Sequence, residues 1–238
     1  NKISEIHEIN NSIKTGKIPE IKKYSISYEV FTKFVNSLYR LKSKLGEQKQ
    51  ESFWMLTLIS FYSISRTAFS TPCSFGGTFF RNKLEELKKK EYECKERFPE
   101  LLEFFKDTII ALDLLVKENR NPIIEEIRKH NLHESDYTVL IKVNADLFDD
   151  TKKMLENVFK ENPDIISEQD LLKVKTYNNL LLVGSVWNFP SYVFESPRSW
   201  STSIISYDKG LGSLRKSEKF IKSYKEPKSY RFEPLQTD

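Results

Sequence analysis

Apolar residues recur at helical spacing through the first half of the chain. Residues 28–45 place large apolar side chains three and four positions apart, which is the period of one buried helix face. Residues 52–69 are apolar nearly all round, as is typical of a helix at the centre of a bundle. A charged helix at 82–96 and another that begins at Pro99 follow. The pattern therefore predicts a helical region over residues 1–118.

The second half of the chain alternates short apolar runs with helical stretches. Residues 137–143 and 203–207 are rich in β-branched and aromatic residues, and 171–177 also read as a strand. Residues 180–184 form a continuous apolar run that ends in Gly, which is typical of a strand buried on both faces of a parallel sheet. The predicted fold class is therefore α/β, with the helical region followed by a small parallel sheet and flanking helices over residues 119–208.

In a parallel sheet of this type, ligands bind beyond the carboxyl ends of the strands. With the strands placed as above, that edge would carry Asn144, Thr176, Gly184, Ser185 and Asp208. The turn at Gly184 has two interpretations: a ligand-facing turn that a backbone can approach closely, or a plain strand exit packed by the aromatic residues that follow. Ser185 does not fit a Ser-His hydrolase, because no histidine follows it in the sequence.

The composition narrows the possible chemistry. The 238 residues include seven glycines, two cysteines and three histidines. The glycines do not form a Walker loop, a dinucleotide fingerprint or a kinase-type loop. Two cysteines cannot make a disulfide framework, so we expect a cytoplasmic setting. Three histidines leave few ligands for a metal centre, so we expect no metal, and we expect no cofactor either. The strongly apolar uncharged run at residues 52–65 is shorter than the roughly 20 residues of a membrane span, so no membrane partner is expected.

Charge is unevenly distributed beneath a formal net charge of +4. Residues 1–118 hold 20 basic and 16 acidic side chains, residues 119–208 hold 10 and 14, and residues 209–238 hold 8 and 4. This last segment is a basic C-terminal tail. Phe220 and Tyr224 lie among its basic residues, and such a mixture suits the binding of nucleic-acid phosphates together with base stacking. The candidate contacts are Lys209, Arg215, Lys216, Lys219 and Lys222. The alternative is a solvated helix whose aromatic residues dock on the sheet.

Two further segments have a chemical and a structural interpretation. Arg198 precedes the last predicted strand and could bind a phosphate in a bidentate manner, or pair with Glu195 or Asp208 to fix its loop. His130 and His133 could ligate a metal, but their spacing supplies no third ligand. A solvated loop between helix and strand is the preferred interpretation of the histidine segment.

From Asn121 onward the chain shows an Asn-Pro helix start, then V-L-I-K-V followed by Asn144, then L-K-V-K-T, L-L-L-V-G, and S-P-R ahead of I-I-S-Y-D. This order resembles the second lobe of a RecA-like helicase domain in degenerate form, as in prokaryotic restriction and phage-defence proteins such as the DISARM-type accessory proteins. The resemblance covers residues 119–208 and implies that Asn144 and Thr176 face nucleic acid and that Arg198 faces a nucleotide. The chain departs from such helicases in having no Walker lysine loop and no Q-x-x-G-R-x-x-R motif, so nothing cradles the β- and γ-phosphates of ATP.

The function predicted from these features is a non-catalytic or incomplete helicase-like module of a nucleic-acid-directed assembly, in antiviral defence. It would contact the phosphates of DNA or RNA through Arg198 and the basic tail. Its partners would be a larger protein assembly or the remainder of the same polypeptide, since the chain starts at Asn1 without Met. The alternative is a scaffold subunit that docks a partner through its aromatic-rich helices. An enzyme that acts at the sheet edge is less favoured, because no acid/base pair stands at a recognisable spacing.

Overall fold

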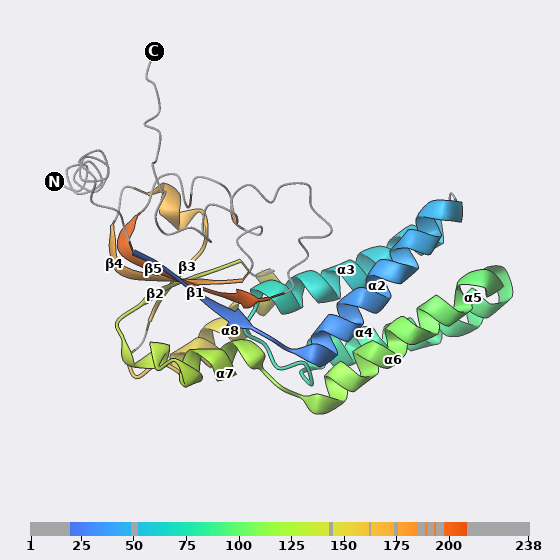
Figure 1. The fold of residues 1–238 in the computed structure, drawn as a ribbon, viewed down its shortest axis with the longest axis horizontal. Helices are drawn as coiled ribbons and strands as arrows, with labels where there is room; N and C mark the ends of the chain where they lie inside the picture. Colours follow the sequence, from blue (N-terminus) through green and yellow to red (C-terminus); the bar gives the residue numbers. More distant parts are fainter. Residues whose placement is uncertain are drawn as a thin grey trace, which may run out of the picture. The chain divides into compact units, whose positions relative to one another are not determined.

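The chain is organised as two compact units, one of them inserted in the other. The computed structural model describes residues 20–48, 52–142, 145–161, 163–173, 176–184, 189, 193 and 198–208. Within these ranges, the sheet unit holds residues 20–26 and those from 123 onward, and the helical unit holds residues 27–122 (Figure 1). The chain therefore leaves the sheet unit after its first strand and returns to it at Ile123.

The sheet unit is built on parallel strands. These are β1 (Glu20–Ile26), β2 (Thr138–Ile141), β3 (Asp164–Ile166), β4 (Tyr177–Val183) and β5 (Ser199–Tyr207), in the spatial order β1-β5-β4-β2-β3. Every pair of neighbouring strands is parallel. The helical elements are α7 (Pro122–Lys129) and α8 (Ala145–Glu156), with the short turns η2 (Leu132–Glu134) and η3 (Asp170–Leu172). The predicted α/β class with a parallel sheet and flanking helices is thus confirmed.

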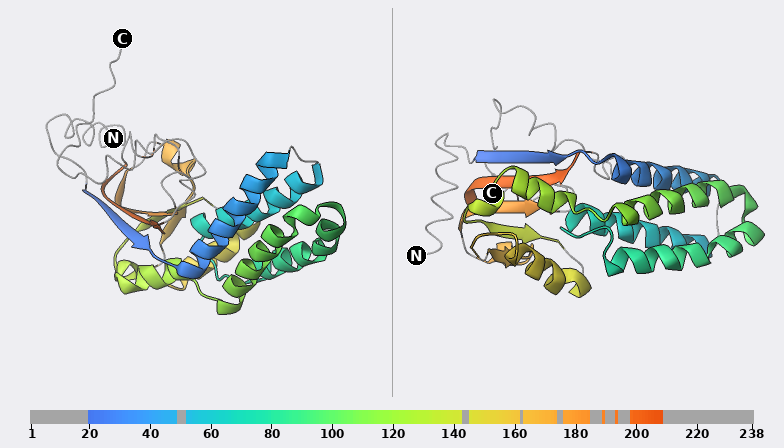
Figure 2. Two further views of the ribbon diagram at one scale, coloured as in Figure 1. Left: turned by 45° about the vertical axis from the view of Figure 1, so that its right-hand side comes forward. Right: turned by 90° about the horizontal axis from the view of Figure 1, so that it is seen from below.

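The two faces of the sheet are covered differently. The helices α7 and α8 lie together on one side of it, called the α7–α8 face (Figures 1 and 2). The opposite side, the η3 face, is covered by an apolar cluster drawn from the strands, from η3 and from the connection between β4 and β5. Its members are Leu140, Ile166, Leu171, Tyr177, Leu180, Leu182, Phe189, Val193 and Ile204. Cover on both sides explains why the central strand β4 is apolar without alternation from Leu180 to Val183.

Three elements differ from the sequence prediction. The expected helical character of residues 1–118 is wrong at Glu20–Ile26, which form β1 and pair with β5. The strand predicted at 171–177 is wrong at its start, where residues 171 and 172 belong to η3, and Tyr177 is the first residue of β4. The Asp170 carboxylate accepts hydrogen bonds from the backbone N–H and hydroxyl of Ser167, both at 2.8 Å, and so fixes the turn into η3. Strand β3 was not predicted, since three residues leave too short a pattern to detect.

The helical unit has an aromatic core. Its helices are α2 (Glu29–Gln48), α3 (Ser52–Ser70), α4 (Thr78–Lys89), α5 (Glu91–Arg97) and α6 (Leu102–Glu118), with the turn η1 (Pro99–Leu101) before α6. Phe61 of α3 lies edge-on to Phe105 of α6, with ring centroids 5.8 Å apart, and 6.5 Å from the ring of Phe34 of α2. All three rings are fully buried, so one side of α3 packs into the aromatic core. Ile59 of the same helix is 56% exposed, so the predicted central position, buried on all sides, is wrong.

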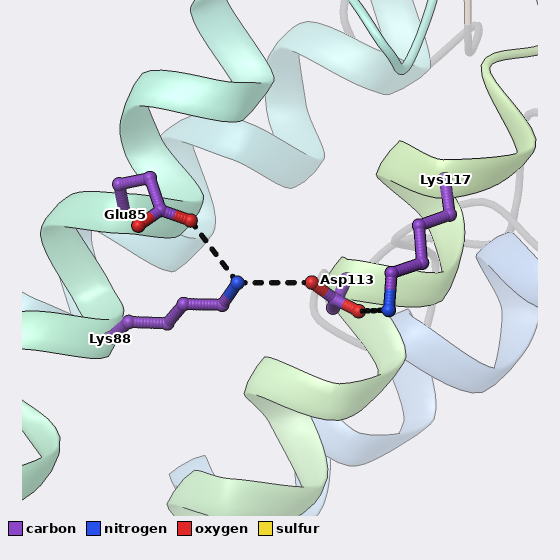
Figure 3. A network of polar contacts seen from close by, with 4 residues as sticks. All are labelled: Glu85, Lys88, Asp113 and Lys117. Carbon is purple, nitrogen blue, oxygen red and sulfur yellow. Dashed lines mark hydrogen bonds and ion pairs between the residues drawn. The ribbon is translucent and has the colours of Figure 1, made fainter.

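A polar network joins α4 to α6 on the outside of the helical unit (Figure 3). Lys88 Nζ lies 3.1 Å from Glu85 Oε1 and 3.1 Å from Asp113 Oδ1, and Lys117 Nζ lies 2.5 Å from Asp113 Oδ2. The hydrogen bond from Lys117, supported by the one from Lys88, holds the pKa of Asp113 below its usual value. Because the lysines are substantially exposed, such pairs contribute only about 0–1 kcal/mol each.

The loop between α3 and α4 is fixed against the end of α6. The backbone N–H of Phe75 donates to the carbonyl of Arg120 at 3.0 Å, and the Ser74 hydroxyl donates to Asn119 Oδ1. Asn119 has a left-handed φ of 50° and ends α6. A Cβ atom on Gly76 would lie 2.1 Å from Asn119 Oδ1, so this close approach requires glycine.

Candidate functional site

The neighbouring strands β2 and β4 send the chain to opposite faces of the sheet. After β2 the chain enters α8 on the α7–α8 face (Figure 2). After β4, the connection to β5 places Phe189 and Val193 in the apolar cluster of the η3 face. A reversal of this kind is where open α/β sheets bind ligands, beyond the carboxyl ends of the strands. The carboxyl edge between β2 and β4 is therefore the candidate site.

The strand register places a row of residues across this edge. Ser25 and Ser206 are paired directly, and the other members lie one or two positions beyond the last paired residue of their strands. In spatial order the edge row consists of Ser25, Ser206, Gly184, Lys142 and Glu168. Parallel neighbours in a sheet lie about 4.8 Å apart, and strand alternation puts the side chains of this row on the η3 face. A polar row therefore borders the apolar cluster of that face.

One ion pair dominates the charge of the edge row. Lys142 Nζ lies 3.1 Å from Glu168 Oε2, and the two side chains are 32% and 29% exposed. Neither residue was predicted as part of a site: Lys142 was counted within a predicted strand, and Glu168 follows β3, which was not predicted. The only available signal was the lysine at the end of an apolar run, and such a lysine is common at strand ends.

Two sequence-predicted residues lie at the carboxyl edge. Gly184 has a φ of 120°, a conformation that favours glycine, and its N–H donates to the Ile205 carbonyl at 2.8 Å. Asp208 is exposed, and its N–H donates to the Ile26 carbonyl at 2.9 Å. Several other predicted residues lie outside the described ranges: Asn144, Ser185, Glu195, Lys209, Arg215, Lys216, Lys219 and Lys222.

Thr176 and Arg198 lie at the opposite, amino edge of the sheet. The expectation that Thr176 follows a strand is wrong, since it precedes β4. Arg198 precedes β5; its Nε–H donates to the Leu171 carbonyl at 3.2 Å, and its own carbonyl accepts from the N–H of Tyr177 at 2.8 Å. The alternative pairing of Arg198 with Asp208 is also wrong, because the length of β5 separates them by roughly 30 Å. Arg198 braces η3 against the start of β4 and β5.

A second polar cluster joins α7 to the edge strand β1. Glu126 Oε1 accepts hydrogen bonds from His130 Nε2 at 2.8 Å and from Lys129 Nζ at 3.0 Å. The His130 ring also contacts Tyr24 of β1, with ring centroids 4.7 Å apart. Glu126 is almost fully buried, so both hydrogen bonds offset the cost of removing its carboxylate from water. His130, which the sequence placed in a solvated loop, is engaged at the end of α7.

The described part of the chain offers few residues for metal binding or for thiol chemistry. No three His, Cys, Asp or Glu residues within the described ranges gather closely enough to hold a metal ion. Burial raises the pKa of both the Cys73 and Cys94 thiols to about 12. Both thiols therefore stay protonated near neutral pH, where they are poor nucleophiles.

Comparisons with protein-family models, with curated proteins and with solved structures find no significant match. Among the helices in the described ranges, none has the length and apolar character needed to span a membrane. The chemistry of the carboxyl edge is the feature from which a function has to be inferred.

Proposed function

We propose that this chain is a non-catalytic nucleic-acid-binding module of a larger cytoplasmic assembly, in the manner of a helicase second lobe in an antiviral system. The observation that carries the proposal is that the connections after β2 and after β4 cross to opposite faces of the sheet. Such a change of face supports a ligand site at this edge, because open parallel sheets bind ligands there. The edge row supplies a lysine there and, at its end, the exposed hydroxyl of Ser25, and both side chains are suited to a phosphate.

The basic tail supports the same proposal through its point of attachment. Residues 209–238 hold 8 basic and 4 acidic side chains and follow directly on Asp208, at the carboxyl end of β5. A phosphate backbone bound at the edge would therefore lie near the start of the tail. Arg198 lies at the amino edge and donates to Leu171, so we assign the phosphate contacts to the tail and the carboxyl edge instead.

The test is binding of short single- and double-stranded DNA by the full chain across a salt series. The variant K216Q/K219Q/K222Q should bind more weakly at low salt, and its log–log salt slope should fall by about 1 for each phosphate that the variant no longer neutralises. A matched control, K23Q/K89Q/K95Q, removes the same charge from exposed lysines elsewhere and should leave the slope nearly unchanged. Absence of binding even at low salt would overturn the proposal.

A scaffold function is the second candidate, and one observation favours it. Ile110 and Leu114 lie one turn apart on α6 and are 58% and 49% exposed. Side chains of this kind are typical of a helix face that docks a partner. If DNA does not bind, I110S/L114S becomes the informative variant: it should fold normally and lose any association seen for the wild-type chain by sedimentation. Unchanged association would count against this face.

A further inference from the structure

We infer that Lys142 is a phosphate-contacting residue and that Glu168 acts as an internal latch which an incoming phosphate must displace. This inference rests on the proposed function and assigns one contact within it. Lys142 and Glu168 hold each other at 3.1 Å, at the carboxyl ends of the neighbouring strands β2 and β3. Neither residue is among the phosphate contacts that the sequence predicts.

The position of Lys142 in the edge row makes it the favoured cation. It follows β2, one of the two strands whose connections cross to opposite faces of the sheet, and its neighbour after β4 is Gly184. Glycine has no side chain, so within the edge row no side chain separates Lys142 from Ser206, the next residue of the row. A lysine is a flexible point charge with three donors, whereas Ser206 is only 4% exposed, so the phosphate contact is assigned to Lys142.

The Glu168 carboxylate pairs with the Lys142 ammonium in the same way as a phosphate oxygen would. Its Oε2 lies 3.1 Å from the Lys142 ammonium, at ion-pair distance. About a third of each side chain is exposed, and partly exposed pairs of this type are weak, so a multivalent anion can replace the carboxylate. The second carboxylate at this edge is Asp208, two positions beyond Ser206 on the same face and exposed. No ion pair joins Asp208 to Lys142 in the described structure.

This difference between the two carboxylates supplies matched variants for the test. E168Q removes one negative charge and the latch, whereas D208N removes one negative charge from the same edge without breaking the pair. K142Q removes the proposed contact. Each variant is tested as the full chain with two probes: a short single-stranded oligonucleotide and a free nucleoside triphosphate without metal. The two probes distinguish a phosphodiester backbone from free nucleotide phosphates as the source of the anion. Circular dichroism and thermal melting check that every variant folds.

E168Q should tighten oligonucleotide binding roughly 2- to 5-fold, the size expected for one partly exposed ion pair, and D208N should have a clearly smaller effect. K142Q should weaken binding and reduce the salt slope by about 1. In K142Q/E168Q the gain from E168Q should vanish, since the latch has nothing to hold. An equal gain from E168Q with and without Lys142, or equal gains from E168Q and D208N, would show general electrostatics and overturn the latch.

The outcomes separate this inference from the proposed function. Wild-type binding that none of the edge variants changes, but that the tail variant K216Q/K219Q/K222Q weakens, would sink the latch and leave the proposed function standing. No binding of either probe at low salt would remove both. Triphosphate binding alone, with the E168Q and K142Q effects intact, would keep the latch and replace nucleic acid by a free nucleotide as its ligand.

Discussion

The helical unit and the sheet unit are assembled from the chain in different ways. The helical unit is one continuous stretch, residues 27–122, whose helices meet in an aromatic core. The sheet unit joins two stretches, because β1 pairs with β5 across the whole of the insertion. The placement of polar groups differs too. The helical unit carries exposed ion pairs between helices, whereas the sheet unit has polar residues along the carboxyl edge of its sheet and at the contact of α7 with β1. Candidate binding chemistry therefore belongs to the sheet unit, while the helical unit is a self-contained packing unit.

The largest expected effect tests whether the two units unfold separately. F105A deletes a fully buried ring that contacts Phe61 and should cost the helical unit about 3–5 kcal/mol. Hydrogen exchange of the β4 amides should stay close to wild type, because Phe105 belongs to the other unit. The matched variant L182A, at a fully buried site of the sheet unit, should show the reverse pattern. Equal loss of protection in both units for either variant would mean that they form a single cooperative structure.

An intermediate effect tests the attachment of β1 within the sheet unit. E126A removes the buried carboxylate that accepts hydrogen bonds from Lys129 and His130, and should cost about 1–2 kcal/mol. Because His130 also contacts Tyr24, β1 should loosen first. The Asp208 amide donates to the last residue of β1 and should exchange faster in E126A. E125A changes an exposed residue of the same helix and should leave that amide nearly unchanged. Unaltered exchange in E126A would show that α7 does not hold β1.

The smallest effect concerns acid stability in the sheet unit. Hydrogen bonds from Lys173 and from Ser167 lower the pKa of Asp170 from 3.8 to about 2. A depressed carboxylate pKa adds stability above pH 3.8, and this stability is lost as the pH falls toward about 2. Since the pair with Lys173 is partly exposed, the contribution is up to about 1 kcal/mol. Melting temperatures of wild type and D170N should differ at pH 7 and converge near pH 2; a constant difference would contradict this linkage.

The sequence predicted those parts of the molecule that local periodicity determines. The helix over 52–69, the buried run at 180–184 and the strand near Tyr207 were all found, because each is a long enough apolar stretch to stand out locally. The burial of the helix was not found correctly, since Ile59 is exposed. β1 was missed because it is an edge strand with the charged sequence E-I-K-K, and only its pairing with β5 makes it a strand. The edge row was missed for the same reason: Lys142 and Glu168 become neighbours through the parallel register of β2 and β3, which no local pattern records.

The insertion between β1 and α7 also sets an order of events on the ribosome. Strand β1 emerges roughly 170 residues before its partner β5, which at 5–20 residues per second is a delay of about 10–30 s. The helical unit is complete well within that interval and can fold on its own stretch of chain. During the delay β1 is an open template for pairing with other nascent chains. Its Glu20, Lys22 and Lys23 place charge along that strand and make such wrong pairing less favourable until β5 arrives.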